Sequence, residues 1–227
     1  DRMSKGLKKA YDEIGTAILN HDAEKIFNHV GIETKKDING KLILSHYCQP
    51  KDYNFTDLGI NEDKLFEQVS EIQGNAEFRN SNLTNLGSLK NIGGNVNFSF
   101  APVKDLGELN HIGGNVDFSY SHIEDLKKLK IIDGNANLSY SSVHNLGKLN
   151  KINGNANLFY TNTTDLGELE YIGGNANFNS SIMDSLGKLK YIGGDAVFGY
   201  TKLKDLGELK EIGGNATFIE AKLKTLG

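Results

Sequence analysis

The chain has 227 residues, of which 38% are hydrophobic and 24% are charged, and its formal net charge at pH 7 is -4. The slight acidic excess gives no electrostatic attraction to nucleic acid or to an anionic membrane surface. No apolar run approaches the roughly eighteen residues that a transmembrane helix needs, so the sequence predicts no membrane span.

Residues 1–70 do not repeat and are predicted to form an N-terminal capping region of helices and a hairpin. After Ser4, apolar residues recur at helical spacing, namely Leu7, Ala10, Tyr11, Ile14 and Ile18. This spacing predicts a first helix, and a second short helix is expected from Ala23 to Val30, with Asp22 as its N-cap.

The rest of the capping region is expected to form a hairpin and a third helix. The pair Asn39-Gly40 precedes the apolar run Leu42-Ile43-Leu44, which predicts a β-hairpin. Asn61 opens a third helix that we expect to run through Val69. Its apolar side chains would cover the open end of the first repeat, whose internal layer would otherwise meet water.

Cys48 is the only cysteine, so the chain has no intrachain disulfide. His46 and Cys48 would share one face of a strand, where they could form part of a metal site or a nucleophile with its base. We favour the alternative, a buried thiol beside a surface histidine, because one such pair is a weak signal. The six histidines occupy different repeat positions or different elements, and no nucleotide-binding, metalloprotease or nucleophile-elbow motif is present. The sequence therefore predicts no catalytic residue, no metal ligand and no cofactor.

From residue 71 onward the sequence repeats every twenty residues without an insertion. Isoleucine marks the period at Ile72, Ile92, Ile112, Ile132, Ile152, Ile172, Ile192 and Ile212. Within each unit the Phe98 position admits only Phe or Leu, and the Val96 position only Ala or Val. Apolar positions of such uniform size predict stacked coils. We expect a solenoid of about eight repeats over residues 71–227, with one short parallel strand per coil near Val96 to Phe98 and a mostly irregular convex side.

The spacing Ile-x-x-x-Ala/Val-x-Phe-x-x-Ser/Thr-x-Val/Leu-x-x-Leu-x-x-Leu resembles the leucine-rich repeat family, in particular the short bacterial type of the internalins and secreted effectors. The matching residues in one repeat are Val96, Phe98, Ala101 and Val103. The family's buried asparagine is replaced by a small residue at Ser81, Ala101, Ser121, Ser141, Thr161, Ser181, Thr201 and Ala221. The resemblance implies a non-enzymatic recognition module in bacterial adhesion or host interaction. It favours a secreted or cell-surface location.

A separate column of amides precedes each predicted strand. It consists of Asn95, Asn115, Asn135, Asn155, Asn175 and Asn215, with Asp195 in the same column. We expect these side chains to hydrogen-bond the backbone of the next coil, which is a structural role and not a ligand contact.

The exposed strand face is the predicted partner-binding surface, because parallel strands present side chains in columns. The candidate residues are Phe100, Tyr120, Tyr140, Tyr160, Tyr200, Asn97, Asn137, Asn157, Asn177 and Phe159. Tyrosine with serine and asparagine suits adaptable contact with a protein. Two interpretations of the aromatic column stay open: a ladder that stacks on itself and stiffens the solenoid, or a binding surface.

We therefore predict recognition of a protein partner, with a carbohydrate as the nearest alternative ligand. Two further classes remain open: the targeting domain of a larger effector enzyme, and a structural solenoid that forms homo-oligomers through its uncapped C-terminal end. Because the last repeat reaches Gly227 without a cap, we expect either a fragment of a longer protein or an end that packs against a partner.

Overall fold

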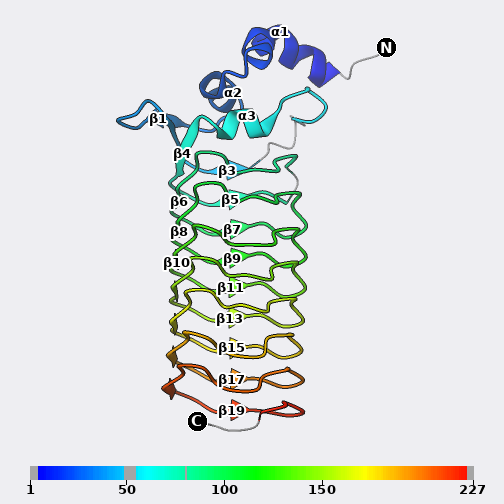
Figure 1. Cartoon of the computed structure of the whole chain (residues 1–227). Helices are drawn as coiled ribbons and strands as arrows, with labels where there is room; N and C mark the ends of the chain where they lie inside the picture. Colours follow the sequence, from blue (N-terminus) through cyan, green and yellow to red (C-terminus); the bar gives the residue numbers. More distant parts are fainter. Residues whose placement is uncertain (1–4, 49–54, 80, 224–227) are drawn as a thin grey trace.

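The computed structural model shows a cap of helices above an elongated stack of coils (Figure 1). It describes residues 5–48, 55–79 and 81–223. Successive coils pair in parallel at a spacing of twenty residues, so that Ile132 lies beside both Ile112 and Ile152. The predicted repeat solenoid is confirmed, as a parallel β-solenoid.

The predicted two-helix start is also confirmed. Helix α1 spans Lys5–Leu19, with a kink at Ile14, and α2 spans Ala23–His29. The Asp22 side chain caps α2 by accepting a hydrogen bond from the Lys25 backbone N–H at 3.2 Å. Side chains of Leu7 and Ala10, which the helical spacing singled out, lie outside the described part of α1.

The hairpin is present, and the third helix is shorter than predicted. Strands β1 (Thr34–Lys36) and β2 (Leu42–Leu44) pair antiparallel around the Asn-Gly turn. Helix α3 spans only Glu62–Phe66. The prediction that it runs through Val69 is wrong, because Val69 begins strand β4 (Val69–Ile72) and pairs with Leu42 of the hairpin.

Each coil contributes two short strands: the predicted strand near Val96 is present as β7 (Val96–Asn97), but a second strand that the sequence did not predict precedes it. Strands before the Gly-Gly turn join β1, β2 and β4 in a ten-stranded sheet: β6 (Asn91–Ile92), β8 (His111–Ile112), β10 (Ile131–Ile132), β12 (Lys151–Ile152), β14 (Tyr171–Ile172), β16 (Tyr191–Ile192) and β18 (Glu211–Ile212). Strands after it form a nine-stranded sheet: β3 (Tyr47–Cys48), β5 (Ala76–Glu77), β7 (Val96–Asn97), β9 (Val116–Asp117), β11 (Ala136–Asn137), β13 (Ala156–Asn157), β15 (Ala176–Asn177), β17 (Ala196–Val197) and β19 (Ala216–Thr217). Both sheets begin within the capping region, since β2 and β3 pair with β4 and β5.

The interior is a set of continuous apolar layers, one for each inward position of the repeat. Ile112, Val116 and Phe118 of one coil are buried, as are their equivalents in neighbouring coils. The rings of Phe98 and Phe118 stack at 5.1 Å between centroids. Burial of each such side chain stabilises the fold by about 1.5–3 kcal/mol, which explains why these positions accept so few residue types.

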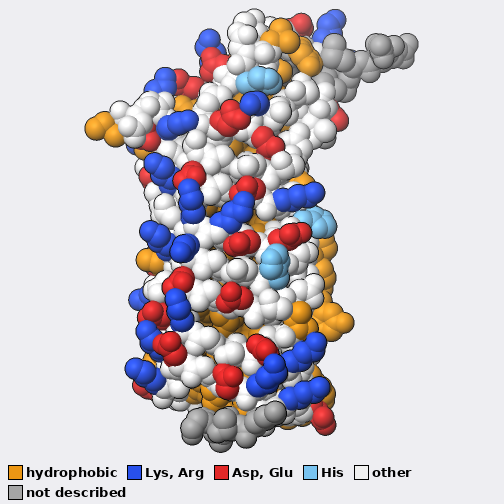
Figure 2. Space-filling view, in the orientation of Figure 1, with side chains coloured by type: hydrophobic (Ala, Val, Ile, Leu, Met, Phe, Trp, Pro, Cys, Tyr) orange, Lys and Arg blue, Asp and Glu red, His pale blue; other side chains and the backbone are white. Residues whose placement is uncertain are grey.

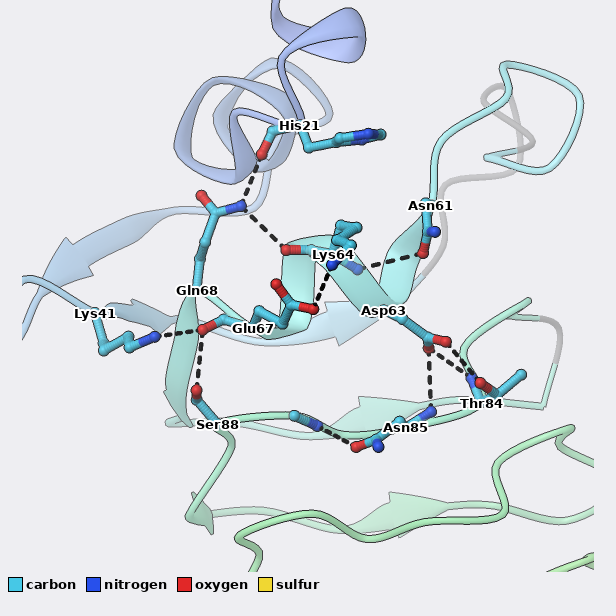
Figure 3. Close-up of polar contacts among 11 residues, drawn as sticks. His21, Lys41, Asn61, Asp63, Lys64, Glu67, Gln68, Thr84, Asn85 and Ser88 are labelled. Atoms are coloured by element: carbon cyan, nitrogen blue, oxygen red, sulfur yellow. Dashed lines mark hydrogen bonds and ion pairs between the residues drawn. The ribbon is translucent and has the colours of Figure 1, made fainter.

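The cap is joined to the first coils by packing and by polar contacts (Figure 3). Phe66 of α3 packs on Phe78 with ring centroids 5.8 Å apart. The Asp63 carboxylate accepts hydrogen bonds from the Thr84 backbone N–H at 2.8 Å, the Thr84 hydroxyl at 2.6 Å and the Asn85 N–H at 3.1 Å. α3 therefore closes this end of the stack, as predicted.

A mixed charged surface covers the face of the coils turned to the viewer in Figure 2. Ion pairs connect successive coils, such as Lys128 with Glu108 at 2.6 Å and Lys188 with Glu168 at 2.7 Å. Exposed pairs of this kind contribute only about 0–1 kcal/mol each. Among the described helices, none has both the length and the apolar character needed to cross a bilayer.

Candidate functional site

The structure places the predicted aromatic column at a corner of the coil and not on the strand face. In one coil the strand ends at Asn97, and Phe100 lies in the turn that follows. Phe100, Tyr120, Tyr140, Tyr160 and Tyr200 have φ values of 56°, 54°, 56°, 53° and 56°. This is the left-handed backbone region, which the strand assignment did not anticipate. Ser99 and Ser119, the residues just before two of these corners, are buried.

Four of these residues stack as an aromatic ladder, consisting of Phe100, Tyr120, Tyr140 and Tyr160. Ring centroids are 4.8 Å apart for Phe100 and Tyr120, 5.1 Å for Tyr120 and Tyr140, and 5.5 Å for Tyr140 and Tyr160. The first two pairs are nearly parallel, whereas the Tyr140 and Tyr160 planes are tilted by 37°. Phe159 is half-buried and meets the Tyr140 ring edge-on at 5.4 Å. Self-stacking is thus confirmed for these four residues of the column.

Stacking alone does not account for tyrosine at this corner. A left-handed conformation costs an ordinary L-residue roughly 1–2 kcal/mol, and a stacked aromatic pair contributes roughly 0.5–1.5 kcal/mol. The two effects nearly cancel. Ser180 and Glu220 adopt the same conformation at equivalent corners, with φ values of 59° and 55°. The fold therefore does not require a ring there.

The predicted asparagines Asn97, Asn137, Asn157 and Asn177 lie on the outer side of the nine-stranded sheet and are half-buried. Each side-chain oxygen accepts a hydrogen bond from the backbone N–H two residues later, as Asn97 does from Ser99 at 2.9 Å. Side-chain amides also bridge coils, from Asn157 to Asn137 at 3.1 Å. These contacts hold the corner that carries the aromatic column, so the asparagines position it.

The other amide column has the structural role that the sequence predicts. The Asn95 side-chain oxygen accepts a hydrogen bond from the Asn115 backbone N–H at 2.8 Å, and the same contact recurs along the stack. Asp195 replaces an asparagine and accepts from the Asn215 N–H at 2.7 Å. The column therefore ties each turn to the next coil.

A groove of about 990 Å³ runs along the nine-stranded sheet from β3 to β13. Its lining consists of His46, Tyr47, Cys48, Gly74, Asn75, Ala76, Glu77, Asn95, Val96, Asn97, Asn115, Val116, Asp117, Asn135, Ala136, Asn137, Asn155 and Asn157. The sequence analysis did not predict this groove. The available signal was two columns of polar residues, those of Asn95 and Asn97, on either side of a small Ala or Val.

His46 and Cys48 lie at one end of this groove and share an exposed face, with buried Tyr47 between them. The prediction of a shared face is confirmed, but that of a buried thiol is wrong: Cys48 is exposed. His46 Nδ1 lies 3.0 Å from the Ser45 hydroxyl. Within the described residues no group of three or more His, Cys, Asp or Glu side chains is arranged to hold a metal ion.

The surface thus offers two features: a half-buried polar groove from β3 to β13 whose amides are engaged with one another, and an exposed aromatic column three residues further on, at the corners of Phe100, Tyr120, Tyr140, Tyr160 and Tyr200. The first is occupied by contacts within the fold, whereas the second projects ring edges and hydroxyls into solvent. Comparisons of the chain with protein-family models, with curated proteins and with solved structures find no match.

Proposed function

We propose that this protein is a non-enzymatic recognition module that binds a partner protein through its aromatic column. One observation carries the proposal: tyrosine occupies an exposed left-handed corner in coil after coil, although Ser180 and Glu220 occupy the same corner with the same backbone. A residue that the fold does not need and the backbone disfavours is best explained by what it contacts outside the chain.

The stacking favours a protein over a carbohydrate. Sugar rings bind aromatic side chains through the ring faces, but within the ladder the faces of Tyr120 are covered by neighbours at 4.8 and 5.1 Å. What remains accessible is a row of ring edges and hydroxyl groups. These combine an apolar body with a hydrogen-bonding tip and suit protein interfaces.

The resemblance to leucine-rich repeat proteins extends the proposal to bacterial adhesion or host interaction. Its support is the twenty-residue period and the restricted size of the apolar positions, which Ile132, Ala136 and Leu138 exemplify in one coil. A bacterial surface or secreted protein is the setting that this resemblance favours.

A capture experiment tests the proposal. The variant Tyr120→Asn/Tyr140→Asn/Tyr160→Asn removes three rings. It replaces them with asparagine, which tolerates the left-handed conformation. We expect a protein captured from bacterial or host lysate by the wild type to bind this variant at least about tenfold more weakly, a loss of about 1.4 kcal/mol. The melting temperature should change little, because lost stacking and relieved backbone strain offset each other.

The matched control is Glu108→Gln/Lys128→Gln, which removes an exposed ion pair from the charged face and should leave capture unchanged. Undiminished capture by the tyrosine variant would overturn the proposal. A large fall in that variant's melting temperature would instead assign the rings a purely structural role.

A further inference from the structure

The aromatic column is interrupted at one coil, where Ser180 stands between Tyr160 and Tyr200. The corner itself is regular there, because Ser180 has a φ of 59° and donates its N–H to the Gly199 carbonyl at 2.8 Å. The neighbouring corners make the equivalent bonds, from Tyr160 to Asn179 at 3.0 Å and from Tyr200 to Ile219 at 2.8 Å. Only the ring is missing. We call the resulting space the Ser180 gap.

The dimensions of the Ser180 gap match one missing rung. Adjacent strands are about 4.8 Å apart, so rings two coils apart are separated by about 9.6 Å. A planar group centred between them would lie about 4.8 Å from each, which is the spacing of Phe100 and Tyr120 in the ladder. At this strand spacing one flat group fits between the corners of Tyr160 and Tyr200, where Ser180 presents only a small side chain.

The two tyrosines that border the gap are also the most exposed of the tyrosines in the column. Tyr160 is 62% exposed and Tyr200 is 61% exposed, compared with 46% for Tyr120 and 43% for Tyr140 within the ladder. Among the ring contacts of the described residues, none involves Tyr200. Ring faces, which elsewhere are covered by neighbours, are thus available here.

The ladder itself shows which kind of group can act as a terminal rung. At its N-terminal end the Arg79 guanidinium lies over the Phe100 ring, 5.1 Å from the centroid, at the same spacing as a stacked ring. A guanidinium is planar and cationic, and it is attracted to the negative face of an aromatic ring, whereas an ammonium group is not planar. Two tyrosine faces would bind it from both sides.

We propose that the Ser180 gap is the specificity-determining pocket of the recognition surface and that it takes an arginine side chain of the partner protein. This inference rests on the proposed function and deepens it. The exposed carboxylate of Glu220, one coil beyond Tyr200, is the acidic group at the equivalent corner that complements a cation, and Lys202, two residues after Tyr200, is the exposed cation beside it. Ile182, 38% exposed and two residues after Ser180, offers apolar contact to the methylene stem.

The test uses N-acetyl-arginine amide as the probe, titrated into the full chain and followed by NMR of the tyrosine ring protons. We expect shifts at Tyr160 and Tyr200 that exceed those at Tyr120 and Tyr140. Ser180→Tyr, which fills the gap with the residue found at the equivalent corners, should weaken these shifts about tenfold. Ser180→Asn, a small side chain that tolerates the left-handed backbone, is the matched control and should keep them.

Four outcomes would overturn the inference. Equal shifts with N-acetyl-lysine amide would indicate charge attraction alone, and stronger shifts with N-acetyl-phenylalanine amide would assign the gap to an aromatic group. Probe binding that survives Ser180→Tyr would place the arginine elsewhere. If the probe fails while Tyr120→Asn/Tyr140→Asn/Tyr160→Asn still loses the captured protein, the recognition role stands and only the arginine pocket is wrong.

Discussion

In the repeat region, a single short polar side chain makes a hydrogen bond between one coil and the backbone of the next. From β7 to β19, the residue before each strand of the nine-stranded sheet donates its backbone N–H to the side-chain oxygen one coil earlier, as Asn155 does to Asn135 at 2.7 Å. A carboxylate serves equally well, since Asp195 makes the same contact with Asn215. What the position requires is therefore an acceptor oxygen on a short side chain.

This requirement predicts opposite outcomes for two substitutions at one position. Asn135→Ala removes the acceptor and should lower the free energy of unfolding by roughly 0.5–1.5 kcal/mol. Asn135→Asp keeps an oxygen in place and should cost less than about 0.5 kcal/mol. Urea denaturation of both variants measures the difference. Equal losses would show that the hydrogen bond contributes nothing.

A second prediction at the residue scale concerns Tyr47, whose hydroxyl donates to the buried Glu62 carboxylate at 2.8 Å. Burial, reinforced by the Glu62 charge, raises the pKa of Tyr47 well above its usual value near 10. The folded state thus holds a proton that the unfolded chain releases, so stability is full below about pH 10 and falls as the pH rises further, by up to about 1.4 kcal/mol per pH unit.

Tyr47→Phe keeps the ring, which stacks on Phe78 at 5.1 Å, but has no proton to lose. The variant should be less stable at neutral pH, and its stability should decline less steeply between pH 10 and pH 12, measured by urea denaturation across that range. Tyr200→Phe, at an exposed position, is the control and should follow the wild type. Parallel curves for Tyr47→Phe and wild type would contradict the assignment.

Among the elements, helix α3 is short, yet it closes one end of the stack and is anchored at both of its own ends. Its Asp63 side chain receives three hydrogen bonds from Thr84 and Asn85, and the Ser88 hydroxyl donates to the Glu67 carbonyl at 3.0 Å just after the helix (Figure 3). A five-residue helix has no stability of its own in water. Its structure depends on these contacts and on buried Leu65 and Phe66.

We therefore expect Asp63→Ala to lower the free energy of unfolding by about 2 kcal/mol, since it leaves backbone donors without their partner. Glu67→Gln is the matched control. It removes only the exposed ion pair of Glu67 with Lys64 at 2.8 Å and should cost less than about 0.5 kcal/mol. Thermal unfolding followed by circular dichroism distinguishes them, and equal effects would contradict an anchoring role for Asp63.

Prediction from sequence succeeded where a residue's size or spacing repeats and failed where backbone conformation decides. The twenty-residue repeat correctly placed Ile132 and Leu138 in the core, because both positions admit only large apolar side chains. It gave no sign of the strand Ile131–Ile132, since two residues are too short for alternation to be visible. The corner at Tyr140 was also missed, because aromatic residues rarely adopt positive φ and the sequence pattern resembled a strand.

At the scale of the whole molecule, each coil of the repeat region contacts mainly the coils before and after it. Pairing between Ile131 and Lys151 and between Ala136 and Ala156 has the same register in one coil after another. Stability is then close to a sum of coil and interface contributions.

This architecture predicts that the chain tolerates the loss of one whole coil. Deletion of residues 132–151 joins Ile131 to Ile152 in register and should give a folded solenoid, shorter by about 4.8 Å along its axis. Deletion of residues 132–141 is the control, because it leaves one coil of half length, which cannot complete the stack and should disrupt packing between the coils before and after it. Circular dichroism and small-angle X-ray scattering report both results. An unfolded 132–151 deletion would refute the additive description.

The uniform coil length also sets how the molecule responds to mechanical load. Under tension applied along the solenoid axis, coils can detach one after another from the end, because each is held only by its neighbour. Every detached coil releases twenty residues, which extend to about 70 Å of slack chain. Under load the protein would therefore lengthen in equal steps, and it would shorten in the same steps when the load is removed and the coils refold.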